Sequence, residues 1–131
     1  MKKILFVCSG NVGRSQMAEA FYNYYSESKD AISAGTDEDT PIKYPEIPKE
    51  IRQIMLEEGI DISLQKVKLI DKRLVERADR IFVMCEKVLC PDFLVNSRKI
   101  VFWVIKDPYQ MSLDGMRKIR DQIKAKVKTI I

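Results

Sequence analysis

The chain contains 131 residues, of which 46% are hydrophobic and 32% are charged, and its formal net charge is +4. This length supports one domain over residues 1–131, and no apolar stretch approaches the roughly 20 residues that a membrane span requires. The sequence has no histidine, which excludes Ser-His and Cys-His catalytic pairs and most zinc sites, so we expect neither a metal nor a cofactor.

Short apolar segments predict β-strands, and amphipathic stretches between them predict helices. The expected strands are residues 3–7, 30–34, 80–84 and 99–104. Apolar residues recur at helical spacing in residues 17–25, 47–55 and 113–130. Strands that alternate with helices favour an α/β fold with a parallel sheet covered on both faces. Ligands of such sheets bind beyond the carboxyl ends of the strands.

The charges and the N-terminus favour a cytoplasmic protein without a nucleic-acid partner. Basic residues are interspersed with acidic ones in residues 66–80 and 117–128 and do not gather with aromatic residues into a basic patch. The N-terminal Met1-Lys2-Lys3 leads at once into a short apolar strand, so we expect no signal peptide. Three cysteines in a cytoplasmic chain favour chemistry over structural disulfides.

The segment from Cys8 to Ser15 carries the strongest functional signal, because it joins the first strand to a helix expected to begin near Gln16. Glycines allow successive backbone N–H groups to point inward, and a helix N-terminus attracts anions. A helix N-terminus beside a guanidinium also favours a thiolate, so we predict Cys8 as a nucleophile and Arg14 as a bidentate clamp on a phosphoryl group. The predicted phosphate-binding residues are Ser9, Gly10, Asn11, Val12, Gly13, Arg14 and Ser15.

The sequence Asp107-Pro108-Tyr109 follows the fourth strand and therefore belongs to the same edge of the sheet. Protonation of a leaving oxygen requires an acid, and without histidine a carboxyl group is the natural donor. We therefore predict Asp107 as the general acid, with a turn-forming role before proline as the alternative. Tyr109 and Tyr44 are predicted as aromatic walls of the substrate site, and packing is the alternative role for both.

With these motifs the chain resembles the low-molecular-weight protein tyrosine phosphatase superfamily, which includes thioredoxin-coupled arsenate reductases. The resemblance extends from Lys3 to about Lys128. The matching landmarks are Cys8 to Ser15, Gln16-Met17-Ala18-Glu19, Ser33-Ala34-Gly35, Gly59-Ile60-Asp61-Ile62-Ser63, Ala78-Asp79 and Asp107-Pro108-Tyr109.

The resemblance implies a three-layer sandwich with a four-stranded parallel sheet of order 2-1-3-4 and helices on both faces. It also implies Cys8 as the nucleophile, Arg14 as the transition-state clamp and Asp107 as general acid and then base. Asn11 and Ser15 would brace the loop and the thiolate. Phosphate esters would react through a phosphocysteine that water hydrolyses.

Cys85 and Cys90 leave a second activity open. Reductases that resemble this chain need two further thiols after the third strand, where these cysteines stand. Positions i and i+5 of an intact helix point about 140° apart, so the two thiols pair only if the turn between them is irregular, which Pro91 favours. The alternative is that both are buried, unreactive thiols among apolar neighbours.

Other features favour the phosphatases. Tyr109 is an aromatic residue typical of the phosphatase branch, and Lys68 matches a basic position of phosphatases where thioredoxin-coupled reductases tend to have an acidic residue that helps to bind potassium. The interval between Cys85 and Cys90 is also short for a reductase. The expected substrate is thus a phosphorylated protein or a small phosphomonoester. Arsenate with thioredoxin is the alternative, followed by a non-catalytic phosphate-binding, arsenate-binding or redox-sensing module. No pattern specifies a particular substrate or an oligomeric state.

Overall fold

The computed structural model describes residues 2–131, and Met1, part of the predicted N-terminal pattern, lies outside the described residues. A single parallel sheet has the strand order β2-β1-β3-β4, as expected. The strands are β1 (Ile4–Cys8), β2 (Ala31–Gly35), β3 (Arg80–Val83) and β4 (Ile100–Phe102). The fourth strand is shorter than predicted, because only its first residues pair with β3.

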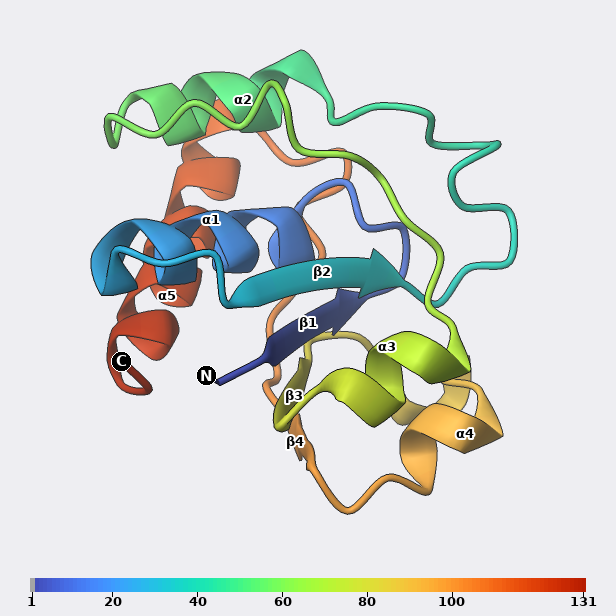
Figure 1. Cartoon of the computed structure of the whole chain (residues 1–131). Coiled ribbons are helices and arrows are strands. Elements are labelled where there is room, and N and C mark those ends of the chain that lie inside the picture. Colours follow the sequence, from blue (N-terminus) through green and yellow to red (C-terminus); the bar gives the residue numbers. More distant parts are fainter. Residues whose placement is uncertain (1) are drawn as a thin grey trace.

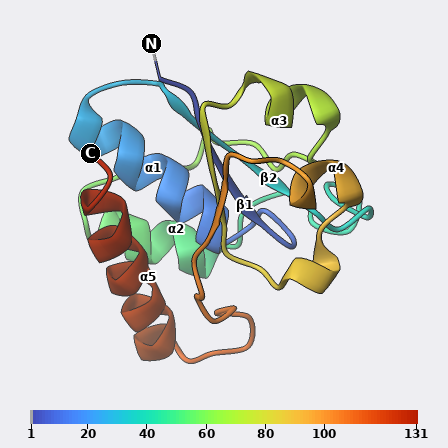
Figure 2. The same cartoon turned by 90° about the horizontal axis from the view of Figure 1, so that it is seen from below.

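Helices cover both faces of the sheet (Figures 1 and 2). The helices on one face are α1 (Arg14–Ser26), α2 (Lys49–Leu56) and α5 (Leu113–Lys128). The short helices on the other face are α3 (Lys72–Arg77) and α4 (Asp92–Val95), and the 3-10 turn η1 (Lys87–Leu89) precedes α4. No periodic pattern predicted α3 or α4, since four to six residues are too few to show one. No helix within residues 2–131 has the length and apolar character needed to cross a membrane.

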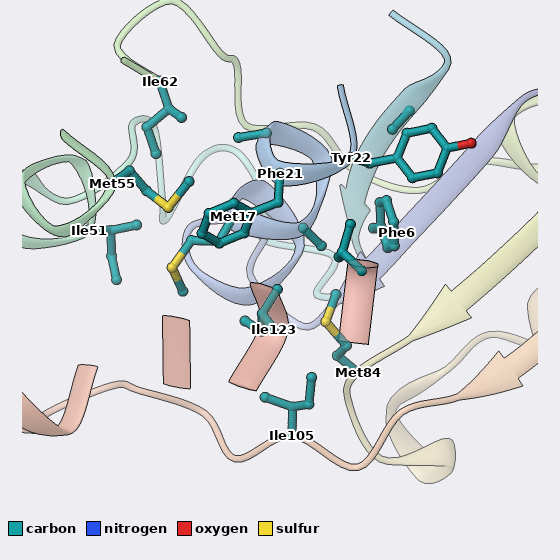
Figure 3. Packing of buried hydrophobic residues seen from close by; sticks show 14 of the residues in the cluster. Phe6, Met17, Phe21, Tyr22, Ile51, Met55, Ile62, Met84, Ile105 and Ile123 are labelled. Carbon is teal, nitrogen blue, oxygen red and sulfur yellow. The ribbon is translucent and has the colours of Figure 1, made fainter. Parts of the chain in front are cut away.

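The centre of the fold is β1, all five residues of which are buried. Successive side chains of a strand point to opposite faces of the sheet. Phe6 therefore packs with Met17 and Phe21 of α1 in the larger hydrophobic cluster (Figure 3), while Leu5 and Val7 belong to the smaller cluster on the α3 and α4 face. Burial on both faces explains why β1 reads as a continuous apolar run.

The parallel register brings the ends of three strands together. Cys8 lies opposite Gly35 of β2, and Val7 lies opposite Val83 of β3. The backbone N–H of Met84 then donates to the carbonyl oxygen of Val7 at 2.8 Å. The segments that follow these strands consequently begin at one edge of the sheet, the side on which the long loop of residues 36–48 lies in Figure 1.

An ionic network fastens α2 to α5. The Arg117 guanidinium donates to the Glu57 carboxylate at distances of 2.8 to 3.1 Å, and Arg120 Nη1 donates to Glu57 Oε1 at 2.7 Å. These hydrogen bonds, with Arg117 contributing most, lower the pKa of Glu57 from 4.5 to about 2. A carboxyl group whose pKa is lowered by folding stabilises the native state above its unfolded pKa and loses that contribution as pH falls through its folded pKa.

We predict that Glu57→Gln reduces the pH dependence of stability in the acid range. The wild-type melting temperature should fall as pH decreases from about 4.5 to about 2, because protonation of Glu57 breaks this network. The variant should be less stable at neutral pH and show a shallower decrease, measured by circular dichroism. Glu46→Gln, outside the network, serves as the control. Parallel pH curves for Glu57→Gln and wild type would contradict the prediction.

Candidate active site

The loop after β1 ends at a helix N-terminus that is open to a ligand. Helix α1 begins at Arg14, two residues earlier than predicted, and the N–H of Met17 donates to the carbonyl oxygen of Gly13 at 3.0 Å. Gly13 is the N-cap residue and has no side chain that satisfies the first-turn N–H groups. Those donors and the positive end of the helix dipole are therefore directed toward the loop, where they favour an oxyanion.

The Cys8 sulfur lies at the end of a short chain of hydrogen bonds. Asn11 Nδ2 donates to Ser15 Oγ at 2.7 Å, and Ser15 Oγ lies 2.9 Å from Cys8 Sγ. Because an amide nitrogen only donates, the Ser15 hydroxyl proton is free to point at the sulfur. Asn11 and Ser15 are thus joined to the sulfur by hydrogen bonds, and their role in bracing the loop stays a prediction.

Asn11 also ties the loop to a distant segment. Its backbone is in the left-handed region with a φ of 57°, which asparagine tolerates better than most residues. Its Oδ1 accepts from Gln16 Nε2 at 3.0 Å and from the backbone N–H of Lys68 at 2.8 Å. Gln16 Nε2 further donates to the carbonyl oxygen of Lys66 at 2.8 Å. The sequence did not reveal these supports, because two of them are backbone groups.

Arg14 is buried, and its guanidinium is held from two sides. Its Nη1 donates to the carbonyl oxygens of Met84 at 2.6 Å and Ile105 at 3.0 Å, which lie just beyond β3 and β4. Its Nη2 donates to Ser9 Oγ at 3.3 Å and lies 3.7 Å from Asp107 Oδ2. One arm of the fork is thus anchored in the protein, and the other faces the loop, where it can bind an oxyanion.

Asp107 reaches the same side of the site. Its Oδ1 accepts from the N–H of Tyr109 at 3.0 Å, which is the turn-forming contact, and its side chain is 56% exposed. Pro108 packs against the loop, since its Cγ lies 3.4 Å from the position of a Cβ on Gly13. The carboxyl group therefore combines the turn role with a position beside Arg14. Its role as general acid stays a prediction.

The two predicted aromatic walls differ in their surroundings. The Tyr44 ring covers Gly10, with ring carbons 3.3 and 3.4 Å from the position of a Cβ there. Tyr109 is 73% exposed. Tyr44 thus lies directly at the loop, and Tyr109 is free to contact a ligand that stands above it. Contact of each ring with a substrate stays a prediction.

Gly35 at the end of β2 allows the loop to pack closely. A Cβ at this position would lie 2.7 Å from the backbone oxygen of Ser9 and 3.1 Å from Asn11 Cβ. The neighbouring backbone completes the contact, because Thr36 donates to the carbonyl oxygen of Cys8 at 3.0 Å and Asp37 to that of Ser9 at 2.9 Å. Gly35 therefore cannot carry a side chain, because its backbone lies too close to the backbone of the loop at Ser9.

We predict that Gly35→Ala destabilises the protein by about 2 kcal/mol or more and weakens phosphate binding, because the new methyl group displaces the loop. Urea unfolding and isothermal titration with inorganic phosphate measure the two effects. Glu38→Ala, an exposed substitution in the loop that follows β2, is the control for stability. Equal losses of stability in both variants would contradict the prediction.

Two further thiols stand beside this loop. Cys85 lies two residues beyond β3 and is buried, whereas Cys90 is partly exposed. Their sulfurs are 4.0 Å apart, because η1 is a 3-10 turn and Cys90 itself is extended. The irregular turn required for pairing is therefore present. Burial, followed by the neighbouring thiols Cys90 and Cys8, raises the pKa of Cys85 to about 12.

We predict slow alkylation of Cys85 at neutral pH, tested in a Cys8→Ser/Cys90→Ser background. Burial, the largest cause, still raises the pKa of Cys85 in this background, so the thiol holds little thiolate at pH 7 and its rate with iodoacetamide should rise about tenfold per pH unit. Mass spectrometry measures the labelled fraction, and the same variant in urea gives the reference rate. A native rate at pH 7 equal to the rate in urea would show that Cys85 is not protected.

A buried ion pair supports the loop from behind. Glu19 of α1 accepts from Ser33 Oγ at 2.7 Å, and its Oε1 lies 3.8 Å from Lys68 Nζ. Burial raises the pKa of Glu19 and lowers the pKa of Lys68, while the attraction between the two charges opposes both shifts. The Lys68 ammonium group therefore pairs with Glu19 and also donates to the carbonyl oxygen of Lys66 at 2.5 Å, while its backbone supports Asn11.

A thiol, an anchored guanidinium and a carboxyl group around an open helix N-terminus are the groups expected of a cysteine-based enzyme that acts on tetrahedral oxyanions. A family model described as low molecular weight phosphotyrosine protein phosphatase matches residues 3–131. The chain belongs to this family.

Individual relatives carry two kinds of name. The chain is 34% identical over 130 residues to an arsenate reductase of Brevibacillus brevis, with 97% of this chain and 92% of the relative covered. A solved structure of an arsenate reductase in the phosphate binding state has a TM-score of 0.84 at 31% identity, covering 99% of this chain and 96% of that chain. A low molecular weight protein tyrosine phosphatase from T. tengcongensis has a TM-score of 0.83 at 26% identity, covering 99% and 97% of the two chains.

These matches change the balance between the two predicted activities. The two arsenate reductases named above are more than 30% identical to this chain, whereas the phosphatase is 26% identical. The sequence features that favoured a phosphatase, Tyr109 and Lys68, therefore have less weight than the alternative based on Cys85 and Cys90. The family and the fold are shared by both groups.

Proposed function

We propose that this protein is an arsenate reductase that uses Cys8, Cys85 and Cys90 in succession. The observation that carries the proposal is the 4.0 Å separation of the Cys85 and Cys90 sulfurs at the edge where β1 presents Cys8. Phosphate ester hydrolysis does not require such a pair, but a reductase needs it to remove oxidising equivalents from its nucleophile. The names of the relatives support the same assignment.

The reaction begins on the anion loop. The Cys8 thiolate attacks the arsenic of arsenate, an As–S bond forms, and one oxygen leaves as water after protonation by Asp107. The loop N–H groups and the free arm of Arg14 stabilise the charge on the remaining oxygens. Arg14 Nη2 lies 3.7 Å from Asp107 Oδ2, and this short separation supports the pairing of these two residues in the first step.

Two thiol exchanges complete the reduction. Cys85, as a thiolate, attacks Cys8 Sγ, a disulfide forms, and the As–S electron pair remains on arsenic, which leaves as arsenite. Arsenic is thereby reduced by two electrons. The Cys90 thiolate then attacks Cys85 Sγ, which frees Cys8 and leaves a Cys85–Cys90 disulfide for an external dithiol such as thioredoxin to reduce. The protons of Cys85 and Cys90 pass to solvent.

Phosphomonoester hydrolysis is the second candidate, and Asp107 is the observation that favours it. A carboxyl group beside Arg14 suits protonation of an alcohol or phenol leaving group. The same site would then form a phosphocysteine on Cys8. Phosphorus is not reduced by a thiol, so this intermediate ends only by attack of water, and Cys85 takes no part.

We predict that Cys85→Ser impairs arsenate reduction but not phosphate ester hydrolysis, measured by two assays of one preparation. Arsenate-dependent oxidation of NADPH, coupled through thioredoxin and its reductase, should fall by at least about 100-fold, because no other buried thiol can resolve the intermediate. Hydrolysis of p-nitrophenyl phosphate should stay within about 2-fold of wild type, since it requires only the loop and the acid. Cys8→Ser, which removes the nucleophile, should abolish both activities.

Cys90→Ser provides the matched control for the relay. It should release about one arsenite per protein and then stop, with a Cys8–Cys85 disulfide detectable by peptide mapping. The proposal fails if wild type hydrolyses aryl phosphates but does not turn over arsenate with thioredoxin or with glutaredoxin and glutathione. It also fails if arsenate turnover survives Cys85→Ser.

We predict that Asp107→Asn lowers p-nitrophenyl phosphate hydrolysis by about 100-fold, the effect typical of removing a general acid. The amide keeps an oxygen that can accept from the N–H of Tyr109, so the turn persists. Steady-state kinetics across pH measure the loss, and thermal unfolding checks the fold. A variant with wild-type turnover would return Asp107 to a purely turn-forming role.

A further inference from the structure

The hydroxyl of Thr36 is buried beside the sulfur of Cys85. Thr36 directly follows β2, its residue is 9% exposed, and its Oγ1 lies 4.0 Å from Cys85 Sγ. Within residues 2–131 this sulfur is the one hydrogen-bonding partner that the hydroxyl has. We infer, on the basis of the proposed reductase function, that Thr36 is a positioning residue that holds Cys85 next to Cys8 and donates its O–H to the Cys85 thiolate.

The first support is that one residue contacts both cysteines. The backbone N–H of Thr36 donates to the carbonyl oxygen of Cys8 at 3.0 Å, while its side chain reaches Cys85. Thr36 is thus joined to Cys8 through its backbone and to Cys85 through its side chain. These two contacts set the spacing between the two cysteines. No other part of the described chain makes this pair of contacts.

The second support is that the position of Thr36 is fixed. The N–H of Gly35 donates to the carbonyl oxygen of Lys68 at 2.8 Å, and the N–H of Ile70 donates to the carbonyl oxygen of Gly35 at 2.8 Å. The missing Cβ of Gly35 keeps this segment against the backbone of Ser9. The Thr36 hydroxyl is therefore carried by backbone that is anchored on both sides.

The third support is the chemical need of Cys85. To attack Cys8 Sγ, its thiol must first lose a proton in a buried position, and burial disfavours the charged thiolate. A hydroxyl adjusts to either state, because it accepts from a thiol and donates to a thiolate. Hydrogen bonds to a charged acceptor are stronger than those to a neutral one, so the Thr36 contact strengthens when the thiolate forms.

The other ionisable groups around Cys85 do not replace this donor. Cys90, after η1, has its sulfur 4.0 Å from Cys85 Sγ but directs its S–H to the carbonyl oxygen of Glu86 at 3.6 Å, and Cys8 is the thiol that Cys85 attacks. Arg14 directs its Nη1 to the carbonyl oxygens of Met84 and Ile105 and its Nη2 toward Ser9 and Asp107. The donor that the described residues supply to Cys85 Sγ is the hydroxyl of Thr36.

Thr36→Val and Thr36→Ser form a matched pair of variants, because valine keeps the shape without the hydroxyl and serine keeps the hydroxyl without the methyl group. In the Cys8→Ser/Cys90→Ser background, Thr36→Val should shift the pH profile of Cys85 alkylation upward by about one pH unit, whereas Thr36→Ser should leave it near that of the parent. Thr36→Ala also lacks the hydroxyl and gives a second test if the valine variant folds poorly.

The same substitutions in the chain with all three cysteines test the reaction itself. Rapid-quench measurement of arsenite release in a single turnover should slow by about tenfold in Thr36→Val, with recovery in Thr36→Ser. Each rate is divided by the rate of p-nitrophenyl phosphate hydrolysis of that variant, which reports the reactivity of Cys8 and corrects for any general disturbance of the loop.

The outcomes separate this inference from the proposed function. Alkylation profiles that coincide for Thr36→Val, Thr36→Ser and the parent overturn the role of Thr36, even if wild type reduces arsenate. Equal loss in the valine and serine variants also overturns it, because the effect would then follow packing and not the hydroxyl. A wild type that does not reduce arsenate refutes the proposed function and this role with it, whatever the alkylation profiles show.

Discussion

The buried guanidinium of Arg14 is the interaction on which the arrangement of this site depends. Its Nη1 joins the first turn of α1 to carbonyl oxygens just beyond β3 and β4. Without that cation, two backbone acceptors near the sheet edge would lose a partner, and unpaired buried polar groups are costly. The segments that carry Cys85 and Asp107 are thus positioned relative to Cys8 by a residue that also contacts the anion loop at Ser9. Fold and binding are coupled through one side chain.

Structure that depends on neighbouring residues, such as strands, helices and motifs, could be predicted from the sequence. Contacts between segments that are distant in the sequence could not. The order of strands and helices and the anion loop follow from local patterns and from the family resemblance. The contact of Gly35 with Ser9 depends on how β2 lies against β1, and no motif reports it. Helix α1 starts earlier than expected because Arg14 and Ser15 are polar and do not contribute to an apolar stripe. Pairing of Cys85 with Cys90 was predicted only on condition of an irregular turn, which η1 supplies.

The two activities considered for this site differ in what attacks the covalent intermediate. Both begin with Cys8 on a tetrahedral centre, held by the same N–H groups and the same arm of Arg14. Arsenic accepts an electron pair when its bond to sulfur breaks, so attack by a neighbouring thiol can release it as arsenite. Phosphorus does not accept this pair, so a phosphocysteine is released only by hydrolysis. The identity of the central atom, together with the presence of Cys85, therefore decides the outcome. This explains how proteins of one family and one fold carry both names.

The three thiols become more accessible in the order in which the proposed reaction uses them. Cys8 and Cys85 are buried, and Cys90 is partly exposed at the end of an exposed turn. In the proposed reaction, a disulfide between Cys85 and Cys90 would be reached by a reductant from the side of Cys90, while Cys8 would already be free for the next oxyanion. The reductant and the substrate would then be selected by different parts of the chain. Changes in residues 86–90 can adapt the protein to another electron donor while the loop of Cys8 remains as it is, so the two specificities can evolve separately.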